Sequence, residues 1–491
     1  MPTIPIFQKR GKEWVARAFD RTQVPEPIFD ADPRLVDLYW FAWELAWNHV
    51  LERPGIPQSP YIDCGFTPGG GKVIWIWDSC FMALYCKYAP HIFPGVETLN
   101  NFYSMIHDGV KTPFKIEHAD NPPLFAWAEW ENFRFTGDID RLRFILTEKQ
   151  YLQKHFDFIE HTRRWHWLHY ATNPLFAQRF PLGFLWSGVA SGMDNTPRGR
   201  GKRRHMLWLD LLAQQGLTAD YISQVATTLG DSATSADFQS RYATIKDLLN
   251  THYWDAKDGI YYDIKRKHPE QFVKVKTPAA FWPMLARMCS SEQAEQLVAK
   301  LLDPHCLGGE VPLPSVSRDD PDFDPRGSYW RGGVWLPTAY MATKALERYG
   351  YYELADATAA QLVDHMERTY REHSPHTIWE LYSPTAPQPG TTGNHHSPAR
   401  PDFCGWSALG PISMFIENIL GFHHVDALEP RVTWRLYQEG RHGIRRLRFG
   451  SILADIVTEG GTVEVTANGP FTLEINGQSF AIEEGSQSFT L

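Results

Sequence analysis

The sequence predicts an all-α fold, an (α/α)6 barrel of six helical hairpins, with a small antiparallel β module at its C-terminal end. Two observations support this. Twelve stretches with apolar residues at helical spacing follow one another through most of the 491 residues. Segments in which apolar and polar residues alternate, as they do in strands, appear only after residue 431. Twelve helices are the number that six hairpins require.

The first helix has the clearest start. Asp32 is a good N-cap, and Pro33 suits the first helical position. Further along, Pro90 and Gly137 are residues that end helices. We expect the twelve helices at 33–50, 78–88, 95–110, 123–135, 139–163, 205–229, 236–253, 279–289, 292–302, 334–349, 352–372 and 406–420.

In the C-terminal stretch apolar and polar residues alternate and glycines separate the alternating segments, a pattern that predicts strands joined by turns. We expect strands at 432–436, 444–449, 453–457, 462–467 and 471–475. A module of this size is too small to be confidently self-sufficient, so we expect it to pack on the barrel. The predicted organisation is an extended segment at 1–30, which is expected to join the β module, a barrel at 31–425 and a β domain at 426–491.

Two long irregular segments interrupt the helical pattern, at 313–325 and 386–401. Such loops in a compact domain are usually functional or mobile. For each loop two interpretations remain equally open: it closes over a pocket, or it is a surface loop without such a role.

Composition narrows the possible partners and location. A net charge of −9 argues against nucleic acid or an anionic membrane as the main partner. No apolar run is long enough to span a bilayer, and the N-terminal residues do not read as a signal peptide. The six cysteines show no paired spacing, which fits a reducing compartment, so we expect a cytoplasmic protein. His395 and His396 have no further ligand at metal spacing, and we expect no metal and no cofactor. The oligomeric state stays open.

Two acidic motifs indicate the chemistry. Residues 191–198 read SGMDNTPR and residues 377–384 read TIWELYSP. Each places one carboxylate, Asp194 or Glu380, in a short loop near aromatic residues. Two carboxylates flanking a bond are the minimum equipment for hydrolysing a glycoside. Aromatic rings suit the apolar faces of a sugar and can desolvate a carboxyl group. The neighbouring aromatic residues are Trp186, Trp379 and Tyr382.

Two further motifs precede helices and have two interpretations each. Asp78 next to Trp77 forms either a helix N-cap beside a core ring or a clamp for a sugar. In the motif at 329–335, Gly332 allows close approach of backbone and ligand, and Arg331 either fixes a sugar oxygen or carboxylate or forms a simple ion pair in a glycine turn.

Three charged or turn-forming features lie near the first acidic motif. Asn195 to Pro197 also fit an Asx-type turn without any catalytic role. Asp210 lies among apolar residues, so it either orients the Asp194 loop through a buried contact or faces solvent. The basic run at 198–204 is either solvated or attracts an acidic aglycone, the part of the substrate that leaves, such as a glycerate.

In their order, these motifs resemble glycoside hydrolase family 63 and the bacterial mannosylglycerate and glucosylglycerate hydrolases grouped with it. The matching segments, which together span about 75–410, are 75–78, 122–127 with 136–138, 191–198, 329–335, 380–384 and 405–409. The resemblance implies an (α/α)6 barrel and an inverting mechanism, with Asp194 as general acid and Glu380 as general base. It also implies a sugar subsite lined by Trp77, Asp78, Trp330 and Arg331. One departure is Gly333-Val334, where the family often has proline followed by Ile or Val.

The sequence therefore predicts an inverting, exo-acting α-glycosidase that cleaves a small α-glucoside or α-mannoside, of the disaccharide or glycosylglycerate type. A phosphorylase or another sugar-active enzyme on the same barrel, or a non-catalytic sugar-binding protein, remains as an alternative. The sugar and the aglycone stay open. The predicted substrate-binding residues are Trp77, Asp78, Trp186, Trp330, Arg331, Gly332, Trp379, Tyr382 and Trp406.

Overall fold

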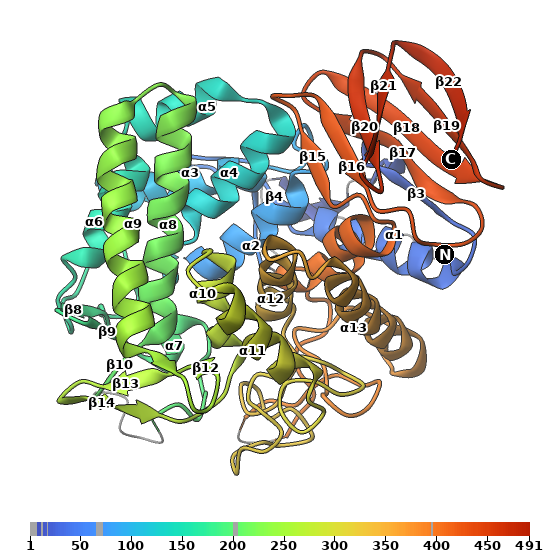
Figure 1. The fold of residues 1–491 in the computed structure, drawn as a ribbon. Coiled ribbons are helices and arrows are strands. Elements are labelled where there is room, and N and C mark those ends of the chain that lie inside the picture. The colour runs from blue at the N-terminus through green and yellow to red at the C-terminus, as the bar shows by residue number, and fades with distance from the viewer. Residues whose placement is uncertain (1–6, 11–12, 17, 65–71, 200–204, 394–395) are drawn as a thin grey trace.

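Helices are the main elements as far as residue 420, and a strand-rich region follows (Figure 1). The computed structural model describes residues 7–10, 13–16, 18–64, 72–199, 205–393 and 396–491. The helical elements are α1 (Pro33–Asn48), α2 (Ile76–Cys86), α3 (Gly95–His107), α4 (Phe125–Thr136), α5 (Ile139–Arg143), η2 (Phe144–Glu148), α6 (Tyr151–Glu160), α7 (Gly188–Ser191), α8 (Leu209–Thr228), α9 (Ser232–His252), η4 (Pro278–Phe281), α10 (Trp282–Leu285), α11 (Ser291–Leu302), α12 (Leu336–Arg348), α13 (Tyr352–Glu372), η5 (Trp406–Leu409) and η6 (Gly410–Ile419).

Each of the twelve predicted stretches contains helix, and local signals explain several boundaries. The Asp32 carboxylate accepts a hydrogen bond from the backbone N–H of Arg34 at the start of α1. Ser290 and Gln293 form a capping box at the start of α11. Gly137 ends α4 in the left-handed conformation that favours glycine.

The stretch predicted as one helix at 139–163 is broken into α5, η2 and α6. Gln150 has a φ of 54°, in the left-handed region, and this residue separates η2 from α6. The predicted helix at 279–289 is also shorter, because α10 ends at Leu285 and Arg287 has a φ of 57°. Helical spacing of apolar residues continues across both interruptions, which is why the sequence does not reveal them.

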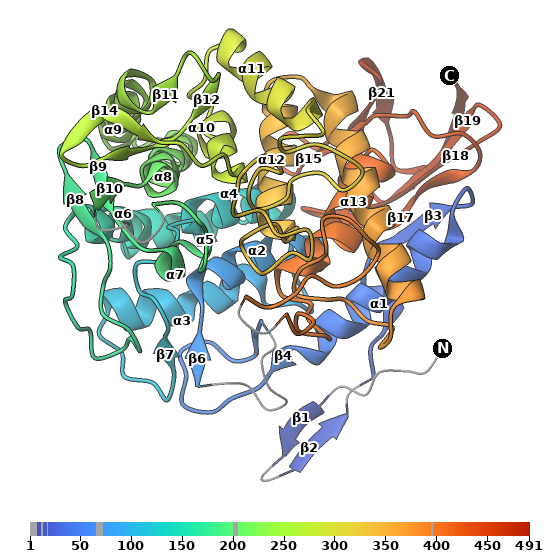
Figure 2. The same ribbon diagram turned by 90° about the horizontal axis from the view of Figure 1, so that it is seen from below.

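Six of the helical segments form a closed circuit of neighbours. Contacts run from α2 to α4, then to α8, α10, α12 and η5, and from η5 back to α2. The remaining long helices pack outside this circuit: α3 on α2, α9 on α8, α13 on α12 and η6, and α1 on η6. Figure 2 shows the face on which the long segments before α12 and after α13 gather.

Short strands connect the helices. They are β4 (Val50–Leu51), β5 (Tyr61–Ile62), β6 (Val73–Ile74), β7 (Lys115–Ile116), β8 (Gln178–Phe180), β9 (Gly183–Leu185), β10 (Met206–Leu207), β11 (Trp254–Asp255), β12 (Ile260–Tyr261), β13 (Asp263–Lys265) and β14 (His268–Val273), and an antiparallel pair, β1 (Phe7–Arg10) with β2 (Glu13–Ala16), precedes them.

The C-terminal region forms two sheets. Their strands are β3 (Glu26–Phe29), β15 (His424–Asp426), β16 (Arg431–Trp434), β17 (His442–Phe449), β18 (Ile452–Glu459), β19 (Thr462–Ala467), β20 (Phe471–Ile475), β21 (Gln478–Ile482) and β22 (Gly485–Thr490). One sheet has the order β15-β16-β20-β21 and the other β22-β19-β18-β17-β3.

The expectation that the N-terminal segment joins the β module is met by β3, which pairs with β17. The prediction of a purely antiparallel module is wrong at one place, because β16 and β20 run parallel. A hairpin connection would have made them antiparallel, but these strands are separated in sequence by three strands of the other sheet. The division at residues 30 and 425 stays a prediction.

The β region packs on the helices, as expected. The Trp434 indole Nε1 donates to the carbonyl oxygen of Leu420 at 2.7 Å. Arg435 and Asp356 form an ion pair of 3.0 Å between the β region and α13. Arg134 of α4 reaches Asp426 of β15 at 2.6 Å.

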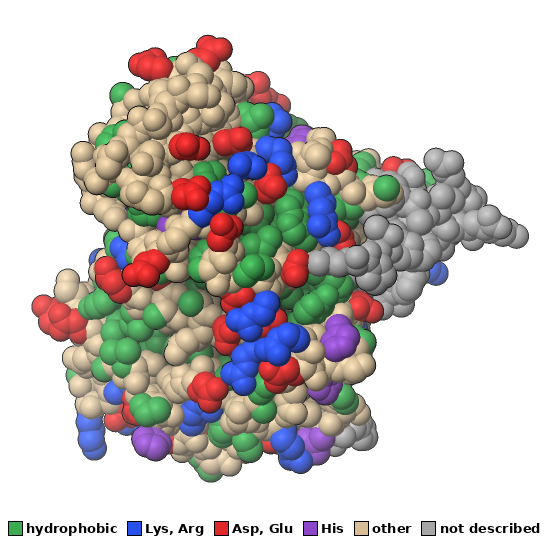
Figure 3. Space-filling view, turned by 90° about the vertical axis from the view of Figure 1, so that its right-hand side faces the viewer, with side chains coloured by type: hydrophobic (Ala, Val, Ile, Leu, Met, Phe, Trp, Pro, Cys, Tyr) green, Lys and Arg blue, Asp and Glu red, His purple; other side chains and the backbone are tan. Residues whose placement is uncertain are grey.

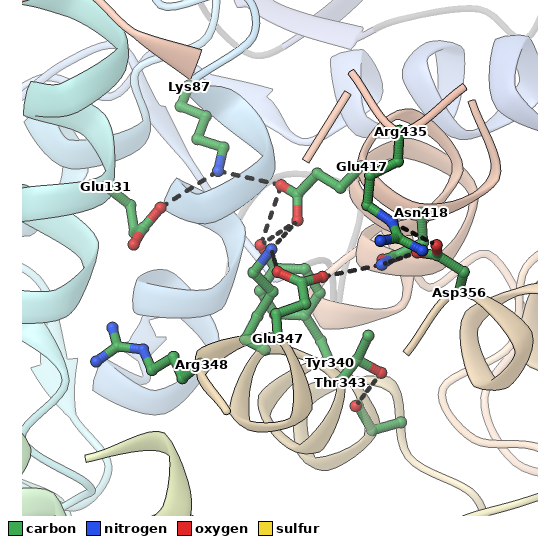
Figure 4. Close-up of polar contacts among 12 residues, drawn as sticks. Lys87, Glu131, Tyr340, Thr343, Glu347, Arg348, Asp356, Glu417, Asn418 and Arg435 are labelled. Atoms are coloured by element: carbon green, nitrogen blue, oxygen red, sulfur yellow. Dashed lines mark hydrogen bonds and ion pairs between the residues drawn. The ribbon is translucent and has the colours of Figure 1, made fainter. Parts of the chain in front are cut away.

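An ion network joins the C-terminal ends of α2, α4 and α12 to η6 (Figure 4). Glu417 of η6 binds Lys87, next to the end of α2, at 3.1 Å and Lys344 of α12 at 3.0 Å. Lys87 also lies 3.5 Å from Glu131 of α4, and Lys344 contacts Glu347. Cations near helix C-termini interact favourably with the helix dipole. These contacts tie the ends of α2, α4, α12 and η6 together.

The surface carries charges of both signs. On the face shown in Figure 3, basic and acidic side chains lie intermixed across the middle of the molecule. Among the described residues, no helix is long and apolar enough to cross a membrane. All six cysteines are free and buried.

Candidate active site

A cavity of about 660 Å³ opens at the N-terminal ends of the circuit helices. Asp78 lies in the first turn of α2, Trp335 caps the start of α12, and Trp406 begins η5. Asp194 and Glu380 come from the loops before α8 and η5. Helix N-termini carry a partial positive charge, which interacts favourably with the acidic side chains of the cavity.

Six of the predicted site residues line this cavity together. They are the two carboxylates of the acidic motifs and four of the predicted substrate-binding residues: Asp194, Glu380, Trp77, Asp78, Trp330 and Trp406.

Three predicted aromatic contacts lie behind the cavity wall. Trp186 is fully buried, and its indole donates to the carbonyl oxygen of Asp120 at 3.0 Å. The Tyr382 hydroxyl accepts a hydrogen bond from the backbone N–H of Trp379 at 3.2 Å. The Trp379 ring packs against His373, 5.5 Å between centroids. These three rings are absent from the cavity lining, and their predicted contact with a sugar stays a prediction.

Arg331 and Gly332 also lie outside the lining. The Arg331 side chain is 46% exposed and lies 3.8 Å from Asp322, which agrees with the ion-pair interpretation of the motif. Gly332 has a φ of 144°, and a Cβ there would come within 2.4 Å of the Asp324 carbonyl oxygen. The turn itself therefore requires glycine at this position.

Glu380 is almost completely buried and is held by donors on both oxygens. The Tyr329 hydroxyl donates to Oε1 at 3.1 Å, and the backbone N–H of Arg400 lies 3.5 Å from Oε2. Burial raises the pKa of Glu380, while Arg400 and the Tyr329 hydroxyl oppose the rise. The pKa of Tyr329 is raised well above its ordinary value by burial, so its hydroxyl stays protonated and donates. The hydrogen bond from Tyr329 favours the ionised form of Glu380, which is the form that accepts a proton.

Asp78 is a buried carboxyl group that faces the cavity. Its oxygen Oδ1 has no hydrogen-bond partner among the described residues. Burial raises its pKa well above the ordinary value, and the nearby Glu380 and Glu117 add to the rise. The helix N-cap is Trp75, so the capping interpretation of Asp78 is wrong. An unsatisfied buried polar atom in a cavity wall is suited to a ligand hydroxyl.

The loop that carries Asp194 packs against two neighbouring parts of the cavity wall. Asn195 accepts from the backbone N–H of Trp330 at 2.7 Å and donates to the Ser328 carbonyl oxygen at 3.0 Å. Gly192 has a φ of 78°, and a Cβ there would meet the Trp77 indole at 3.0 Å. The loop therefore sits directly against the residues of two other cavity walls.

A buried ion pair anchors the same loop to α8. Arg198 is 1% exposed and binds Asp210 at 2.7 Å, with Asp263 at 3.5 Å. Its guanidinium also lies over the Trp208 ring, 4.4 Å from the centroid. This confirms the interpretation that Asp210 orients the loop and is not solvent-facing. Residues 200–204 of the basic run lie outside the described residues.

Stacked tryptophans form another wall. The Trp330 and Trp335 rings are nearly parallel, with centroids 4.1 Å apart, and Trp335 is 5.7 Å from Trp406. All three line the cavity beside Tyr329. Such a wall suits the apolar faces of a sugar ring.

The sequence reasoning missed one whole wall, made of Glu117, His118 and Asn121. The Asn121 amide donates to the Ala190 carbonyl oxygen at 2.8 Å and so joins this wall to the Asp194 loop. Burial raises the pKa of Glu117 and lowers that of His118 to about 4, which leaves the imidazole neutral at neutral pH. The available signal was a cluster of polar residues directly after a short strand, just before the motif at 122–127.

The two irregular segments lie differently with respect to the cavity. Thr392, Gly393 and Arg400 of the segment at 386–401 line the cavity, so this segment is part of the site. The segment at 313–325 supports the site from behind, because the Ser315 hydroxyl accepts from the backbone N–H of Gly332 at 3.0 Å. His395, of the histidine pair, lies outside the described residues.

Known proteins resemble this chain in sequence and in fold. The model of the family described as mannosylglycerate hydrolase MGH1-like glycoside hydrolase domain matches residues 108–397, more than half of the chain. An uncharacterized protein of Borreliella burgdorferi is 27% identical over 431 residues, which are 83% of this chain and 84% of that protein.

Two relatives with named activities align over shorter stretches. The mannosyl-oligosaccharide glucosidase of Saccharomyces cerevisiae is 27% identical over 48% of this chain and 28% of its own length. The mannosylglycerate hydrolase MGH1 of Selaginella moellendorffii is 37% identical over 21% of this chain and 20% of its own length. The chain thus spans less than a third of each of these two proteins.

Solved structures share the fold. The GH63 mannosylglycerate hydrolase from Thermus thermophilus superposes with a TM-score of 0.57 at 16% identity, covering 77% of this chain and 99% of that one. A sialidase gives a TM-score of 0.65 at 14% identity over 95% of this chain and 40% of its own.

The fold, the acidic cavity and the family match together define a glycoside hydrolase. The chain belongs to the mannosylglycerate hydrolase MGH1-like glycoside hydrolase family, and the resemblance to family 63 is confirmed.

Proposed function

We propose that the protein is an inverting, exo-acting α-glycosidase in which Asp194 protonates the leaving oxygen and Glu380 activates the attacking water. The observation that carries this proposal is the placement of both carboxylates on the wall of one aromatic-lined cavity. In an inverting enzyme the acid and the base lie on opposite sides of the scissile bond, about 6.5–9.5 Å apart, which leaves room for the water.

The surroundings of Glu380 support the role of base. A general base has to be ionised before the reaction, and hydrogen bonds donated to a carboxylate favour the ionised form. Tyr329 and the Arg400 backbone provide such donors. The raised pKa brings Glu380 nearer to the operating pH, which makes a carboxylate a better proton acceptor.

Two further carboxyl groups of the cavity are placed to bind the sugar. Asp78 and Glu117 line the same cavity as the catalytic pair. We propose that Asp78 binds a sugar hydroxyl through its unsatisfied oxygen and that the tryptophan wall stacks on the ring.

The closed circuit of helices with outer partners fits an (α/α)6 barrel, and we assign that architecture to the helical region. Two of the relatives are a mannosyl-oligosaccharide glucosidase and a mannosylglycerate hydrolase, which favours glucosides and mannosides as substrate types. We therefore propose an α-glucoside or α-mannoside, with glucose or mannose to be decided by experiment. A cytoplasmic location stays a prediction.

A hydrolysis screen tests the proposal. Purified protein is incubated with glucosylglycerate, mannosylglycerate, kojibiose, nigerose and trehalose, and proton NMR follows the anomer released first. We expect the β-anomer from one of these substrates. Initial release of the α-anomer would show retention and would require new roles for Asp194 and Glu380. Cleavage that requires inorganic phosphate would identify a phosphorylase instead.

A further inference from the structure

Two tryptophans stand out on the surface near the cavity. Trp165 is 58% exposed and Trp167 is 64% exposed, and both lie in the loop between α6 and β8. A large aromatic side chain left in water forgoes the free energy that its burial would give. Exposed aromatic pairs of this kind are typical of surfaces that bind a ligand.

The segment that follows these tryptophans packs on the outer side of the cavity wall at Glu117–Asn121. Thr172 and Asn173 both donate to the Glu117 carbonyl oxygen at 3.2 Å. The backbone N–H groups of Phe176 and Ala177 donate to the Asp120 carboxylate at 2.7 and 2.6 Å. The tryptophan loop is thus attached directly to the wall whose other side faces the cavity.

A row of aromatic rings leads from the cavity to the surface. His118 lines the cavity, and its ring centroid lies 5.7 Å from that of Phe176. Phe176 lies 5.3 Å from Trp165. Two ring contacts therefore separate Trp165 from the cavity wall.

The Trp165 backbone is held in a conformation that is unusual for a bulky residue. Its φ is 67°, in the left-handed region, at a cost of about 1 kcal/mol or more. The Trp165 N–H donates to the Leu175 carbonyl oxygen at 2.7 Å, and the Leu175 N–H donates to that of His166 at 2.9 Å. Arg164 covers the Trp165 ring at 4.9 Å from its centroid. These contacts fix the ring before any ligand arrives, which lowers the entropy lost on binding.

We propose that Trp165 and Trp167 form a stacking platform for the aglycone of the substrate, and that this aglycone contains one or more further sugar rings. The proposal rests on the function proposed above and extends it, because Trp165 and Trp167 are not among the residues that line the cavity. The tryptophan loop lies against the Glu117–Asn121 wall, so the sugar rings that the platform would bind are those that extend past this wall.

Substrate length provides the first test. The cleaved sugar is offered as its 4-nitrophenyl α-glycoside and as the non-reducing residue of a disaccharide and a trisaccharide. In the double variant Trp165→Ala/Trp167→Ala we expect kcat/KM for the trisaccharide, relative to the aryl glycoside, to fall by about three- to tenfold per ring lost. The change is expected in KM, because the platform binds ground state and transition state alike.

Two matched variants control this experiment. Trp165→Phe/Trp167→Phe keeps aromatic faces and should retain most of the trisaccharide preference. Leu302→Ala removes an equally exposed apolar side chain, 61% exposed, at the end of α11 and should leave the preference unchanged. An unchanged trisaccharide-to-aryl ratio in the double alanine variant would overturn the proposal.

A second test does not depend on activity. N-bromosuccinimide oxidises exposed tryptophans, and peptide mass spectrometry locates the oxidised residues. We expect maltotetraose or α-mannotetraose to protect Trp165 and Trp167 in the wild-type protein. Protection by phosphatidylglycerol vesicles but by neither oligosaccharide would overturn the proposal and assign the loop to a membrane surface. Protection by an oligosaccharide without hydrolysis of any glycoside would uphold the platform and count against the proposed reaction.

Discussion

The Glu380 carboxylate acquires its chemistry from the residues that bury it and from Tyr329 and Arg400. Burial between the tryptophan wall and the segment at 386–401 makes ionisation harder, and Tyr329 and Arg400 make it easier. The balance leaves its pKa above the ordinary value for glutamate. No single neighbour would give this result, because burial alone would favour the protonated acid.

The first prediction concerns the catalytic pair. Glu380→Gln removes the proton acceptor, and Asp194→Asn removes the proton donor. We expect each variant to lose about 10²–10⁴ in kcat, since general acid–base steps contribute about that much. Steady-state kinetics on the substrate found in the screen measure this loss, and circular dichroism checks that the variants fold. Wild-type-like activity in either variant would contradict the assignment of that residue.

The second prediction concerns pH. Tyr329→Phe removes a hydrogen bond to the carboxylate, so the pKa of Glu380 should rise further. Because the base works only when ionised, the acid limb of the kcat/KM profile should move to higher pH, by roughly half a unit to one unit. Tyr242→Phe is the control, because that hydroxyl donates to the backbone carbonyl of Ala286 away from the cavity. An acid limb that stays in place, or moves to lower pH, would contradict the role of Tyr329.

At the scale of elements, local sequence explains where helices start but not how loops are held. Asp32-Pro33 and Ser290 mark the starts of α1 and α11 where the structure has them. The break at Gln150 is different, because the apolar spacing of a helix continues across it. The loop at 191–198 keeps its shape through contacts with α8 and with residues 328–330, none of which the local sequence encodes.

The third prediction tests that anchoring. Arg198→Met leaves Asp210 and Asp263 buried without their cation, and breaking a buried ion pair costs about 3–5 kcal/mol. We expect this loss in urea unfolding, together with a lower kcat because the Asp194 loop is released. Adding Asp210→Asn removes one uncompensated charge and should return part of the stability without returning kcat.

A surface variant separates anchoring from charge alone. Arg241 of α9 is paired with Asp157 and Asp237, which are about half exposed, so Arg241→Met should cost less than about 1 kcal/mol and leave kcat unchanged. If the double variant at 198 and 210 recovered full kcat, the ion pair would not be what holds the loop.

At the scale of the whole molecule, closing the circuit of helices creates two chemically different ends. The N-terminal ends surround the cavity, and the C-terminal ends of α2, α4 and α12 meet in the ion network of Figure 4. In that network Glu417 accepts from the hydroxyls of Tyr88 at 2.6 Å and Tyr340 at 3.0 Å, in addition to its two lysines. Burial opposes its ionisation, but Lys344 and Lys87 outweigh burial and lower the pKa of Glu417 to about 2.

The fourth prediction follows from this shift. A carboxyl group with a lowered folded-state pKa stabilises the protein above its unfolded value, near 4.5, and loses that contribution as the pH falls toward about 2. Glu417→Gln leaves two buried lysines without their shared counter-ion and should cost about 3–5 kcal/mol at pH 7. The difference from wild type should shrink as the pH falls from 4.5 toward 2, which urea unfolding at a series of pH values measures.

The matched control is Asp140→Asn, which removes an exposed ion pair with Arg143 and should cost less than about 1 kcal/mol at every pH. A difference between wild type and Glu417→Gln that stays constant down to pH 2 would contradict the lowered pKa.

By itself the sequence determined the twelve helical stretches, five of the C-terminal strands and the two acidic motifs, because apolar spacing, caps and turn residues act over a few neighbouring positions. Tertiary structure decided which aromatic residues face the cavity. Trp186, Trp379 and Tyr382 lie within eight residues of an acidic residue in sequence yet are absent from the cavity lining, while Glu117, His118 and Asn121 belong to it. The reason is physical: a cavity wall depends on how distant helix ends meet, and adjacency along the chain does not fix the side to which a ring points.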